Sequence, residues 1–600
     1  MLEYRDPNFG SRYFVPKDEM LVVTDFPDAS GNAERLCFTN PRELIVAERT
    51  SDVRSALGRV ERAAAAGHYA VGFVAYDAAP AFDAALRVGG HAATTLLWFG
   101  IYDAPHRAPY TRAPAALTDV SWKPHVERAE YENAIADIRR GIGEGSFYQV
   151  SHTIRLRANG LDDPRGIYES LHTAQPSSYG MYLDIGRFKI LSVSPELFFE
   201  TSGRGIRTRP MKGTARRGRW SDEDAACAVA LAASSKDRAE NVMIVDLVRN
   251  DLGRIAEVGT VAVPHLFDVE RHPTLWQMTS TITATLRPDA QLTDIFAALF
   301  PCGSVVGAPK VAAASWIADH EAAPRGVYCG AIGIVRPGGD CVFNVAIRTL
   351  VIDGESGTGE YGAGGGITID STAVGEYDEL LAKAAILGSA PAKFDLLETM
   401  RLCNGVYTRL DRHMRRLLAS ADYFDFPEIA SAVDDALRDC AKRYPEGVHR
   451  VRLVVSRDGS ARTDATPVAP MDSATRASAR CVIDNVPLSS RDPLRFHKTT
   501  RRDVYDERRA AHPEVDEVIL VNERGEATEC TIGNLVVEID GERLTPPLTC
   551  GLLPGVFREE LIELGAVSER VLYPAEVAAA TRIWLVNSLR EWVELDLTRQ

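Results

Sequence analysis

Apolar residues recur at helical spacing early in the chain and are followed by a continuous apolar run. Residues 54–67 read RSALGRVERAAAAG, in which apolar residues at helical spacing predict a helix that ends at Gly67. Residues 68–79 read HYAVGFVAYDAA, and this mostly apolar run predicts a buried strand.

A second pair of patterns follows in the same order. Residues 131–143 place Ala134, Ile135 and Ile138 at helical spacing, and residues 147–158, FYQVSHTIRLRA, alternate as a strand does. From there to about residue 387 strands and helices are mixed without a regular βαβ series. This pattern favours an α+β fold.

The length predicts two large domains, because 600 residues exceed what a single core usually contains. The segment 388–393, GSAPAK, is rich in small residues and includes a proline, so we place the boundary there, with domains at residues 1–388 and 393–600. A weaker boundary is predicted at residues 483–492, IDNVPLSSRD, between two subdomains of the second half.

Composition excludes several classes of function. The formal net charge of −15 argues against a nucleic-acid partner, which usually requires a basic face, although local cations can still bind an anionic substrate. No apolar run approaches the roughly 20 residues that span a bilayer, and the first residues do not resemble a secretory signal. The ten cysteines include no CxxC pair. We therefore expect a cytoplasmic protein without a disulfide framework or membrane association.

Two predicted helices each carry a pair of carboxylates three residues apart. Asp237 and Glu240 form one pair, and Glu376 and Glu379 form the other, with Lys383 following on the same face. Such pairs could hold a hard cation such as Mg²⁺, which prefers oxygen ligands. Spacing alone equally fits solvated helix faces with ordinary Glu–Lys pairs.

Lys212 lies in residues 209–218, RPMKGTARRG, where a preceding proline and a following Gly-Thr pair predict a loop. Residues 194–200 (SPELFFE), 234–256 and 300–310 (FPCGSVVGAPK) surround it in sequence. Together these segments resemble the chorismate-utilising enzymes, which include anthranilate, isochorismate and aminodeoxychorismate synthases. Lysine at position 212 is the residue that the aminodeoxychorismate synthases carry, whereas the other two carry a small residue.

The resemblance implies a magnesium-bound substrate site. It implies that Glu240 and Glu379 bind Mg²⁺ directly and that Asp237 and Glu376 act through water. The residues implied to contact the substrate are Gln149, Thr214, Arg348, Lys383, and Gly364 and Gly365 of a glycine-rich turn at 361–370. Arginine suits a carboxylate because its planar fork donates two hydrogen bonds.

The resemblance also assigns catalytic roles. Glu196 matches a general acid that protonates the departing 4-hydroxyl of chorismate. Lys212 matches a nucleophile that attacks C2 and is later expelled when ammonia attacks C4. Gln149 stands where isochorismate synthases carry a water-activating lysine, and Gln277 stands where many members carry histidine. The cysteine-bearing turn of glutamine amidotransferases does not occur, so ammonia is expected from solution or from a separate amidotransferase subunit.

The second half carries another set of motifs. Residues 410–421 predict a helix that contains Arg416, and Lys498 and Glu529 follow in HKTT and ATEC. The set resembles fold-type IV pyridoxal-phosphate enzymes, with Lys498 as the Schiff-base lysine and Glu529 as the partner of the pyridine nitrogen. It implies that the cofactor is also bound by Arg416, Leu553, Gly555, Asn587 and Ser588, and residues 551–561 predict a turn before a helix, which suits a phosphate.

The resemblances imply an α+β chain with an N-terminal chorismate-binding β-sandwich with helices, followed by a two-subdomain fold-type IV domain. The implied activity is amination of chorismate, followed by lyase release of pyruvate to give 4-aminobenzoate. The alternatives are an aminotransferase of other specificity in the second half, an anthranilate synthase in the first, and a non-catalytic dimerisation module. A homodimer through the C-terminal domain is compatible with the sequence.

Overall fold

The computed structural model describes residues 2–5, 12–15, 20–28, 33–90, 92–106, 112–115, 117, 120–175, 179–388, 394–468 and 478–598. The chain forms two compact units. One comprises residues 1–216 and 228–391, and the other comprises residues 217–227 and 392–600. The boundary expected at 388–393 lies, beyond Gly388, outside the described residues.

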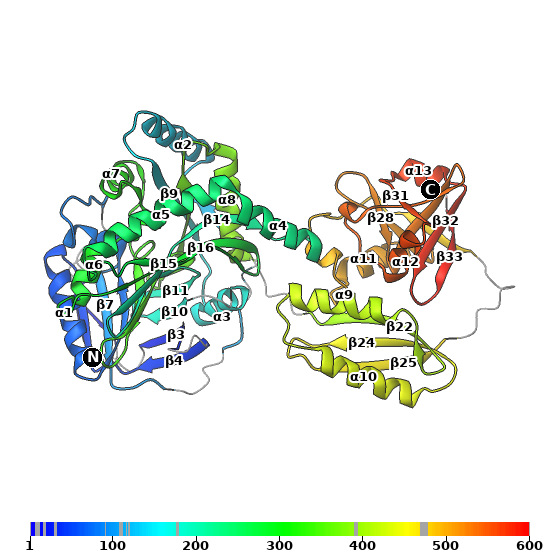
Figure 1. Cartoon of the computed structure of the whole chain (residues 1–600), viewed down its shortest axis with the longest axis horizontal. Coiled ribbons are helices and arrows are strands. Elements are labelled where there is room, and N and C mark those ends of the chain that lie inside the picture. The colour runs from blue at the N-terminus through cyan, green and yellow to red at the C-terminus, as the bar shows by residue number, and fades with distance from the viewer. Residues whose placement is uncertain are drawn as a thin grey trace. The chain divides into compact units, whose positions relative to one another are not determined.

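The first unit contains two large antiparallel sheets (Figure 1). Within the described chain, one sheet has the order β17 (Gly307–Ala308), β9 (Gln149–Ala158), β21 (Thr358–Ile367), β20 (Thr349–Asp353), β11 (Phe188–Ser194), β10 (Tyr179–Asp184), β3 (Leu21–Pro27) and β4 (Ala33–Thr39), with β8 (Lys123–Pro124) paired to β9. The other has the order β14 (Met211–Arg216), β16 (Leu275–Thr285), β13 (Gly205–Arg209), β12 (Leu197–Ser202), β19 (Cys341–Val345), β18 (Ala331–Val335), β6 (Tyr69–Val74), β7 (Leu97–Tyr102) and β5 (Glu43–Ala47), with β15 (Ala262–Arg271) paired to β16.

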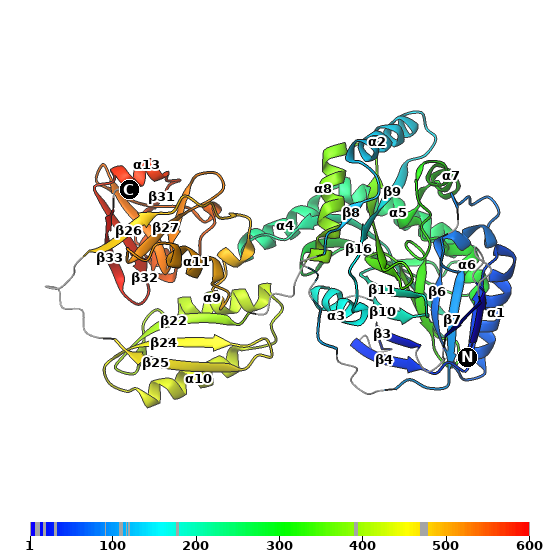
Figure 2. The same ribbon diagram turned by 180° about the vertical axis from the view of Figure 1, so that it is seen from behind.

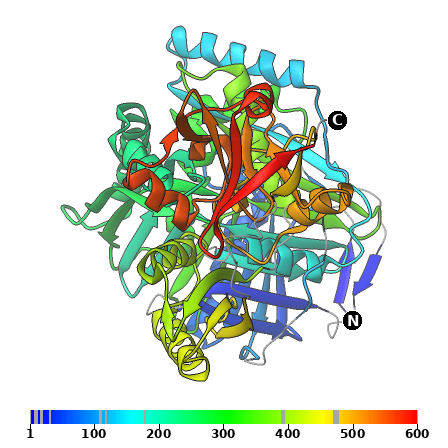
Figure 3. The same cartoon turned by 90° about the vertical axis from the view of Figure 1, so that its right-hand side faces the viewer.

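The two sheets share an apolar core, as the predicted sandwich requires. Val22, Met181 and Ile190 from the first sheet pack with Phe73 and Ile332 from the second. Separate from both sheets, β1 (Leu2–Arg5) and β2 (Arg12–Val15) form an antiparallel pair (Figure 3).

Helices cover the outer faces of this sandwich. The helix α1 lies against β6 and β7 (Figure 2), and its buried Val53, Leu57 and Val60 belong to the larger core cluster. The helices of this unit are α1 (Thr50–Ala65), α2 (Arg128–Gly143), α3 (Pro164–Ala174), α5 (Ser235–Gly253), α6 (Leu292–Leu299), α7 (Lys310–His320) and α8 (Ala373–Ala384).

The predicted helices at 54–67 and 131–143 are confirmed by α1 and α2, and the strand at 147–158 by β9. Two details differ. The strand predicted at 68–79 ends at Val74, and Tyr76–Ala81 form a 3-10 helix. The residues of β9 do not alternate between buried and exposed, because the side chains on both faces of this strand are buried, with one exception.

The second unit contains two sheets. The first has the order β23 (Val406–Tyr407), β22 (Leu396–Cys403), β24 (Val448–Val455) and β25 (Ala461–Pro467), and α9 (Leu410–Tyr423) and α10 (Ala430–Arg443) pack on it (Figure 1). The other has the order β28 (Ala527–Cys530), β27 (Glu517–Val521), β26 (Ala479–Ile483), β33 (Glu591–Leu597), β32 (Arg582–Asn587), β29 (Gly533–Ile539), β30 (Glu542–Thr545) and β31 (Ser568–Glu569). Its helices are α11 (Asp503–Ala511), α12 (Val556–Glu563) and α13 (Pro574–Ala579).

The subdomain boundary predicted at 483–492 is wrong. The first sheet ends at Pro467 and the second begins at Ala479, so the change of sheet precedes Ile483, which already lies in β26. The proline and serines of 483–492 mark the turn into the short helix at Pro493–Arg495 instead.

Residues 217–227 pack within the second unit although the first unit surrounds them in sequence. The Tyr423 hydroxyl donates a hydrogen bond to the Gly218 carbonyl at 2.8 Å, and Trp220 packs on Phe496 with ring centroids 5.0 Å apart. The helix α4 (Ser221–Ala233) begins in this segment. No pattern in the sequence predicted that residues 217–227 pack with the second unit.

Candidate functional sites

A polar cavity of about 400 Å³ lies in the first unit. The strand β14, the helices α5 and α8, and the strand β21 contribute much of its lining. Of the residues that the sequence assigned to the first site, only Gln149 is not in the lining of this cavity. The others all line it: Glu196, Lys212, Thr214, Asp237, Glu240, Arg348, Gly364, Gly365, Glu376, Glu379 and Lys383. The ligand that each of these residues binds stays a prediction.

The predicted loop around Lys212 is wrong, because the residue lies in strand β14 at the end of its sheet. The register with β16 shifts between Met211 and Thr214, and Gly213 has a φ of 92°. Such a bulge changes the direction of the side chains in a strand. It depends on pairing with β16, so the proline and the Gly-Thr pair near Lys212 could not predict it. Burial lowers the pKa of Lys212, and the carboxylate of Glu240 opposes this shift only partly.

Glu196 lies in the connection between β11 and β12 and is 3% exposed. The Ser304 hydroxyl donates a hydrogen bond to its Oε1 at 2.7 Å. Burial raises the pKa of Glu196 to about 7, against the opposing effect of that hydrogen bond and of Lys212. A carboxyl group with this pKa is protonated for a substantial fraction of the time near neutral pH, as a general acid must be.

The carboxylates of α5 and α8 differ in their surroundings. Burial raises the pKa of Glu240, whose Oε1 lies 4.0 Å from the Lys236 amine. Burial also raises the pKa of Glu376, which accepts a hydrogen bond from Ser371 at 2.6 Å. The charge of Lys383, whose amine lies 2.8 Å from Oε1 of Glu379, lowers the pKa of Glu379.

The donor set fits a magnesium ion that completes its shell with substrate and water. Among the described residues no three His, Cys, Asp or Glu side chains converge closely enough to enclose a metal on their own. Glu240 and Glu379 nevertheless line one cavity from two helices, and the negative charge of Glu379 contributes to the raised pKa of Glu240. Mg²⁺ commonly uses one or two protein carboxylates and takes its other ligands from substrate and water.

The glycine-rich turn predicted at 361–370 is also wrong, because residues 358–367 form strand β21, which pairs with β9. Its glycines make space for the site. A Cβ atom on Gly366 would lie 2.0 Å from the Gln149 Nε2 and 2.6 Å from the Lys212 amine. Gln149 therefore lies beside Lys212, fully buried, and neither of its amide atoms has a hydrogen-bond partner in the described structure.

Three further residues at this site were not assigned from the sequence. The Gln277 amide donates to the Gly213 carbonyl at 2.7 Å, and Asn241 donates to the Lys212 carbonyl at 3.3 Å. Lys236 lines the cavity beside Glu240. Gln277 was noted only as a departure from a family histidine. In the structure Gln277 contacts the bulge at Gly213 because it lies opposite Thr214 in the strand pair.

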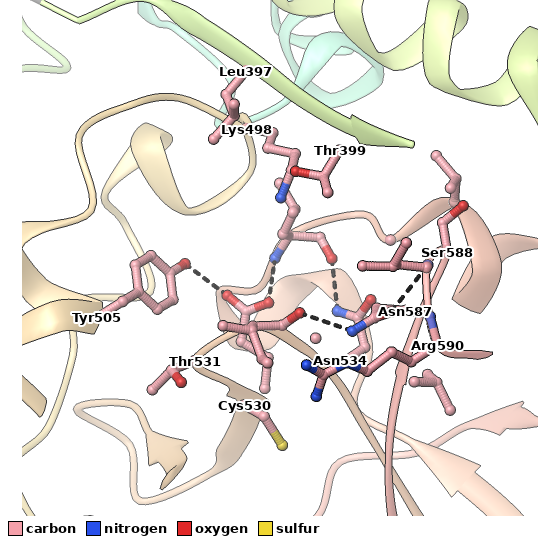
Figure 4. Close-up of a pocket in the computed structure, with 18 of the residues that line it drawn as sticks. Leu397, Thr399, Lys498, Tyr505, Cys530, Thr531, Asn534, Asn587, Ser588 and Arg590 are labelled. Atoms are coloured by element: carbon pink, nitrogen blue, oxygen red, sulfur yellow. Dashed lines mark hydrogen bonds between the residues drawn. The ribbon is translucent and has the colours of Figure 1, made fainter. Parts of the chain in front are cut away.

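A second cavity, of about 380 Å³, lies within the second unit. Figure 4 shows Lys498 and Thr399 pointing into it from one side and Asn587 and Arg590 lying on the other. Its lining includes every residue that the sequence assigned to the second site: Arg416, Lys498, Glu529, Leu553, Gly555, Asn587 and Ser588.

Lys498 is partly buried and Glu529 is buried in this cavity, and their pKa values shift in opposite directions. Burial and the nearby Arg416 charge lower the pKa of Lys498 to about 8. Burial raises the pKa of Glu529 to about 7, although the Tyr505 hydroxyl donates to its Oε1 at 2.7 Å (Figure 4). The Leu553 amide donates to the other carboxylate oxygen at 3.2 Å.

Arg416 is held in place by a buried network. Its Nε and Nη2 donate to the two oxygens of Glu398 at 2.8 and 2.7 Å. His413 bridges Glu398 and Ser588 through its two ring nitrogens, each 2.8 Å from its partner. Burial alone would raise the pKa of Glu398, but the Arg416 charge and the His413 hydrogen bond lower it to about 2. The glutamate was not assigned from sequence because its partners lie 15 and 18 residues away.

The residues fit pyridoxal phosphate. A Cβ atom on Gly555 would lie 1.9 Å from the Asn534 Oδ1, so this position keeps the approach to the start of α12 clear of side chains. Amides at a helix start and a fixed arginine suit a phosphate, and a buried carboxylate suits a pyridine nitrogen.

Comparison with known proteins identifies both halves. The family model described as chorismate binding enzyme matches residues 23–388, which is more than half of the chain. The chain belongs to the chorismate-binding enzyme family. Residues 395–596 match the model of amino-transferase class IV, a fold that implies pyridoxal phosphate.

Curated relatives match just under half of this chain. An aminodeoxychorismate synthase of Streptomyces pristinaespiralis is 40% identical over 282 residues, which are 46% of this chain and 39% of the relative. Aminodeoxychorismate synthase component 1 of Salmonella typhimurium (strain LT2) is 40% identical over 277 residues, 46% of this chain and 60% of the relative. The chain thus spans between about 40% and 60% of the length of these relatives.

A solved structure supports the fold of the first unit. Anthranilate synthase component I from Streptococcus pneumoniae aligns with a TM-score of 0.51 and 26% identity, over 62% of this chain and 90% of that protein. The chorismate-binding sandwich and the class IV fold predicted from sequence are confirmed. In the part of the chain that the structure describes, no helix is both long and apolar enough to cross a membrane.

Proposed function

We propose that this protein converts chorismate and ammonia into 4-aminobenzoate and pyruvate, with the first step in residues 1–388 and the second in 393–600. The observation that carries the proposal is the position of Lys212. Its buried amine has a lowered pKa and shares one cavity with Glu196 and with the carboxylates of α5 and α8. A buried amine of this kind is a nucleophile, and no such residue is needed for simple binding of an anion.

In the first step the neutral Lys212 amine attacks C2 of chorismate, and the ring double bonds shift as the 4-hydroxyl leaves. Glu196 protonates that hydroxyl, so water departs. Ammonia then attacks C4, the double bonds shift back, and the lysine amine is expelled from C2. Gln149 offers no base for activating water, which favours ammonia as the nucleophile.

Magnesium would be held by Glu240 and Glu379, with Asp237 and Glu376 acting through water. It would neutralise a substrate carboxylate that these acids would otherwise repel. Arg348 and Lys383 hold the substrate carboxylates from the same cavity, next to the backbone of Gly364 and Gly365.

In the second step Lys498 anchors the cofactor and transfers the proton that leaves C4 of the substrate ring. Pyridoxal phosphate, when bound, supplies the electron sink for this reaction. Glu529 keeps the pyridine nitrogen protonated, and Arg416 with the amides before α12 binds the phosphate. The C3–O bond breaks, the departing enolpyruvyl group takes up a proton to become pyruvate, and the ring becomes aromatic.

The partners follow from the chemistry of the first step. Relatives are named component 1 of their synthase, which supports a separate glutamine amidotransferase as the source of ammonia. We also propose a homodimer through residues 393–600.

One assay tests the function. The pure protein is incubated with chorismate, ammonium, magnesium and pyridoxal phosphate, and the aromatic product is identified by chromatography. We expect 4-aminobenzoate and an equal amount of pyruvate. Formation of 2-aminobenzoate would contradict the first step and identify an anthranilate synthase. Accumulation of aminodeoxychorismate, together with amino transfer to 2-oxoglutarate, would contradict the second step and identify an aminotransferase.

A further inference from the structure

The second cavity is lined by many more cations than its cofactor requires. Six of its lining residues are arginine or lysine, whereas the one acidic residue among them is Glu529, which is held by Tyr505 and Leu553. The chain as a whole has a formal net charge of −15. The positive lining is therefore local to the site.

Three of these cations are already occupied. Arg416 is paired with Glu398, and Lys498 is the lysine assigned to the cofactor. Arg502 donates to the Thr531 carbonyl at 2.7 Å and stacks on the Tyr505 ring, with its guanidinium carbon 4.9 Å from the centroid.

The other three are Arg450, Arg452 and Arg590. Each is exposed at the cavity and forms no ion pair with the acidic side chains of the described residues. Even Asp464, the register partner of Arg452 on β25, lies beyond ion-pair distance.

Two of them lie on the same face of one strand. Arg450 and Arg452 are two residues apart on β24, whereas the intervening Val451 is fully buried on the other face. Arg452 lies directly opposite Thr399 of β22. The Leu397 amide of that strand donates to the Lys498 carbonyl at 2.9 Å, so the reactive lysine lies beside this arginine-bearing face.

Arg590 approaches from the other subdomain. It lies in the turn between β32 and β33, and the Asn587 side chain fixes the turn by accepting from the Arg590 amide at 2.9 Å. Figure 4 shows Arg590 and Asn587 on the side of the cavity away from Lys498.

We propose that Arg450, Arg452 and Arg590 bind the two carboxylates of an amino dicarboxylate substrate and thereby set the specificity of the second site. The proposal rests on the proposed function, because the intermediate aminodeoxychorismate carries a ring carboxylate and an enolpyruvyl carboxylate. An aminotransferase substrate with a single carboxylate and an apolar side chain would leave most of this positive lining unused. Guanidinium groups match carboxylates through paired, charge-assisted hydrogen bonds.

The test measures binding at the second site without turnover. Chorismate carries both carboxylates but has a hydroxyl where the intermediate has its amine, so it serves as an unreactive dicarboxylate. It is titrated into the full chain with pyridoxal phosphate bound, in chelator and without ammonium, and the absorption of the bound cofactor is recorded because it reports only on this site. Benzoate is the monocarboxylate comparison.

We expect Arg450→Gln, Arg452→Gln and Arg590→Gln each to weaken chorismate binding about tenfold, and benzoate binding less. The matched control is Arg462→Gln, on β25 of the same sheet, since Arg462 is exposed, pairs with Asp395 and does not line the cavity. The control should bind chorismate like the wild type.

Unchanged chorismate binding in all three variants would overturn the inference. Loss of the cofactor absorption itself in these variants, but not in the control, would also overturn it, because the arginines would then hold the cofactor. If chorismate binding weakens as expected but the wild-type protein does not convert aminodeoxychorismate, the inference stands and the proposed lyase function fails.

Discussion

Each unit places one lysine in a cavity, Lys212 in the first unit and Lys498 in the second, and the two lysines differ in what surrounds them. Burial lowers the pKa of both Lys212 and Lys498. At Lys212 the largest opposing influence is the carboxylate of Glu240, whereas at Lys498 the cation Arg416 adds to the effect of burial and the pKa reaches about 8.

The difference indicates how each amine is used. At Lys212 the Glu240 carboxylate opposes the lowering of the pKa by burial, so a bound cation that reduces this negative charge would lower the pKa of Lys212 further. Lys498 lies among arginines that suit an anionic cofactor, and the charge of Arg416 favours its neutral form. On the proposed function, Lys212 acts on a substrate beside a magnesium ion, and Lys498 acts through pyridoxal phosphate.

Replacing the first lysine should produce the largest effect. Lys212→Ala should reduce amination of chorismate on the order of 10⁴-fold, because the nucleophile is lost, while the second step continues when aminodeoxychorismate is supplied. Lys236→Ala is the matched control, since Lys236 lines the same cavity but is about half-exposed beside Glu240. Similar amination rates in the Lys212→Ala variant and the wild type would exclude the covalent role.

Replacing the second lysine should separate the two steps. Lys498→Ala should retain amination and accumulate aminodeoxychorismate, with release of pyruvate reduced about 10⁴-fold. Borohydride should fix the cofactor to residue 498 in the wild type and not in the variant, which peptide mass spectrometry detects. Normal formation of 4-aminobenzoate by the variant would remove Lys498 from the mechanism.

Chelation should distinguish the carboxylate-lined site from the arginine-lined one. Removing Mg²⁺ should slow amination on the order of 10³-fold, because Glu240 and Glu379 would then repel the anionic substrate, and should leave the second step unchanged. Each step is measured with its own substrate in chelator and after Mg²⁺ is restored. A second step that is equally sensitive to chelator would contradict this assignment.

A single added methyl group should disturb Lys212. In Gly366→Ala the Cβ atom would displace the Gln149 amide and the Lys212 amine, and we expect amination to fall about 100-fold. Gly143→Ala is the control, because a Cβ atom there meets no other atom within 4 Å. Equal rates in the two variants would show that the position of the Lys212 amine is not limiting.

The pH dependence should show the smallest effect. Glu196 must be protonated, and with a pKa of about 7 it loses its proton as pH rises, so the amination rate at constant free ammonia should fall about fivefold between pH 7 and pH 8. Glu196→Gln should lower the rate and abolish the alkaline decline. A decline that persists in this variant would assign it to another group.

Some helices could be predicted from the sequence because their apolar pattern lies entirely within their own residues. Helices α1, α2 and α9 repeat apolar residues at helical spacing, and Gly67 and Gly145 follow the ends of α1 and α2, so each helix could be predicted from its own residues. The carboxylate pairs on α5 and α8 could likewise be predicted, because the two acidic residues of each pair are three residues apart in the sequence.

The sequence by itself thus predicted the two folds, several helices and a set of polar residues that, except for Gln149, line the two cavities. Only the tertiary structure decided that Lys212 lies in a strand, that the glycines of β21 make room for its amine, and that residues 217–227 pack in the second unit. These features depend on strand pairing and burial between residues far apart in the chain. The lowered pKa values of the two lysines follow from the same burial, which no local pattern records.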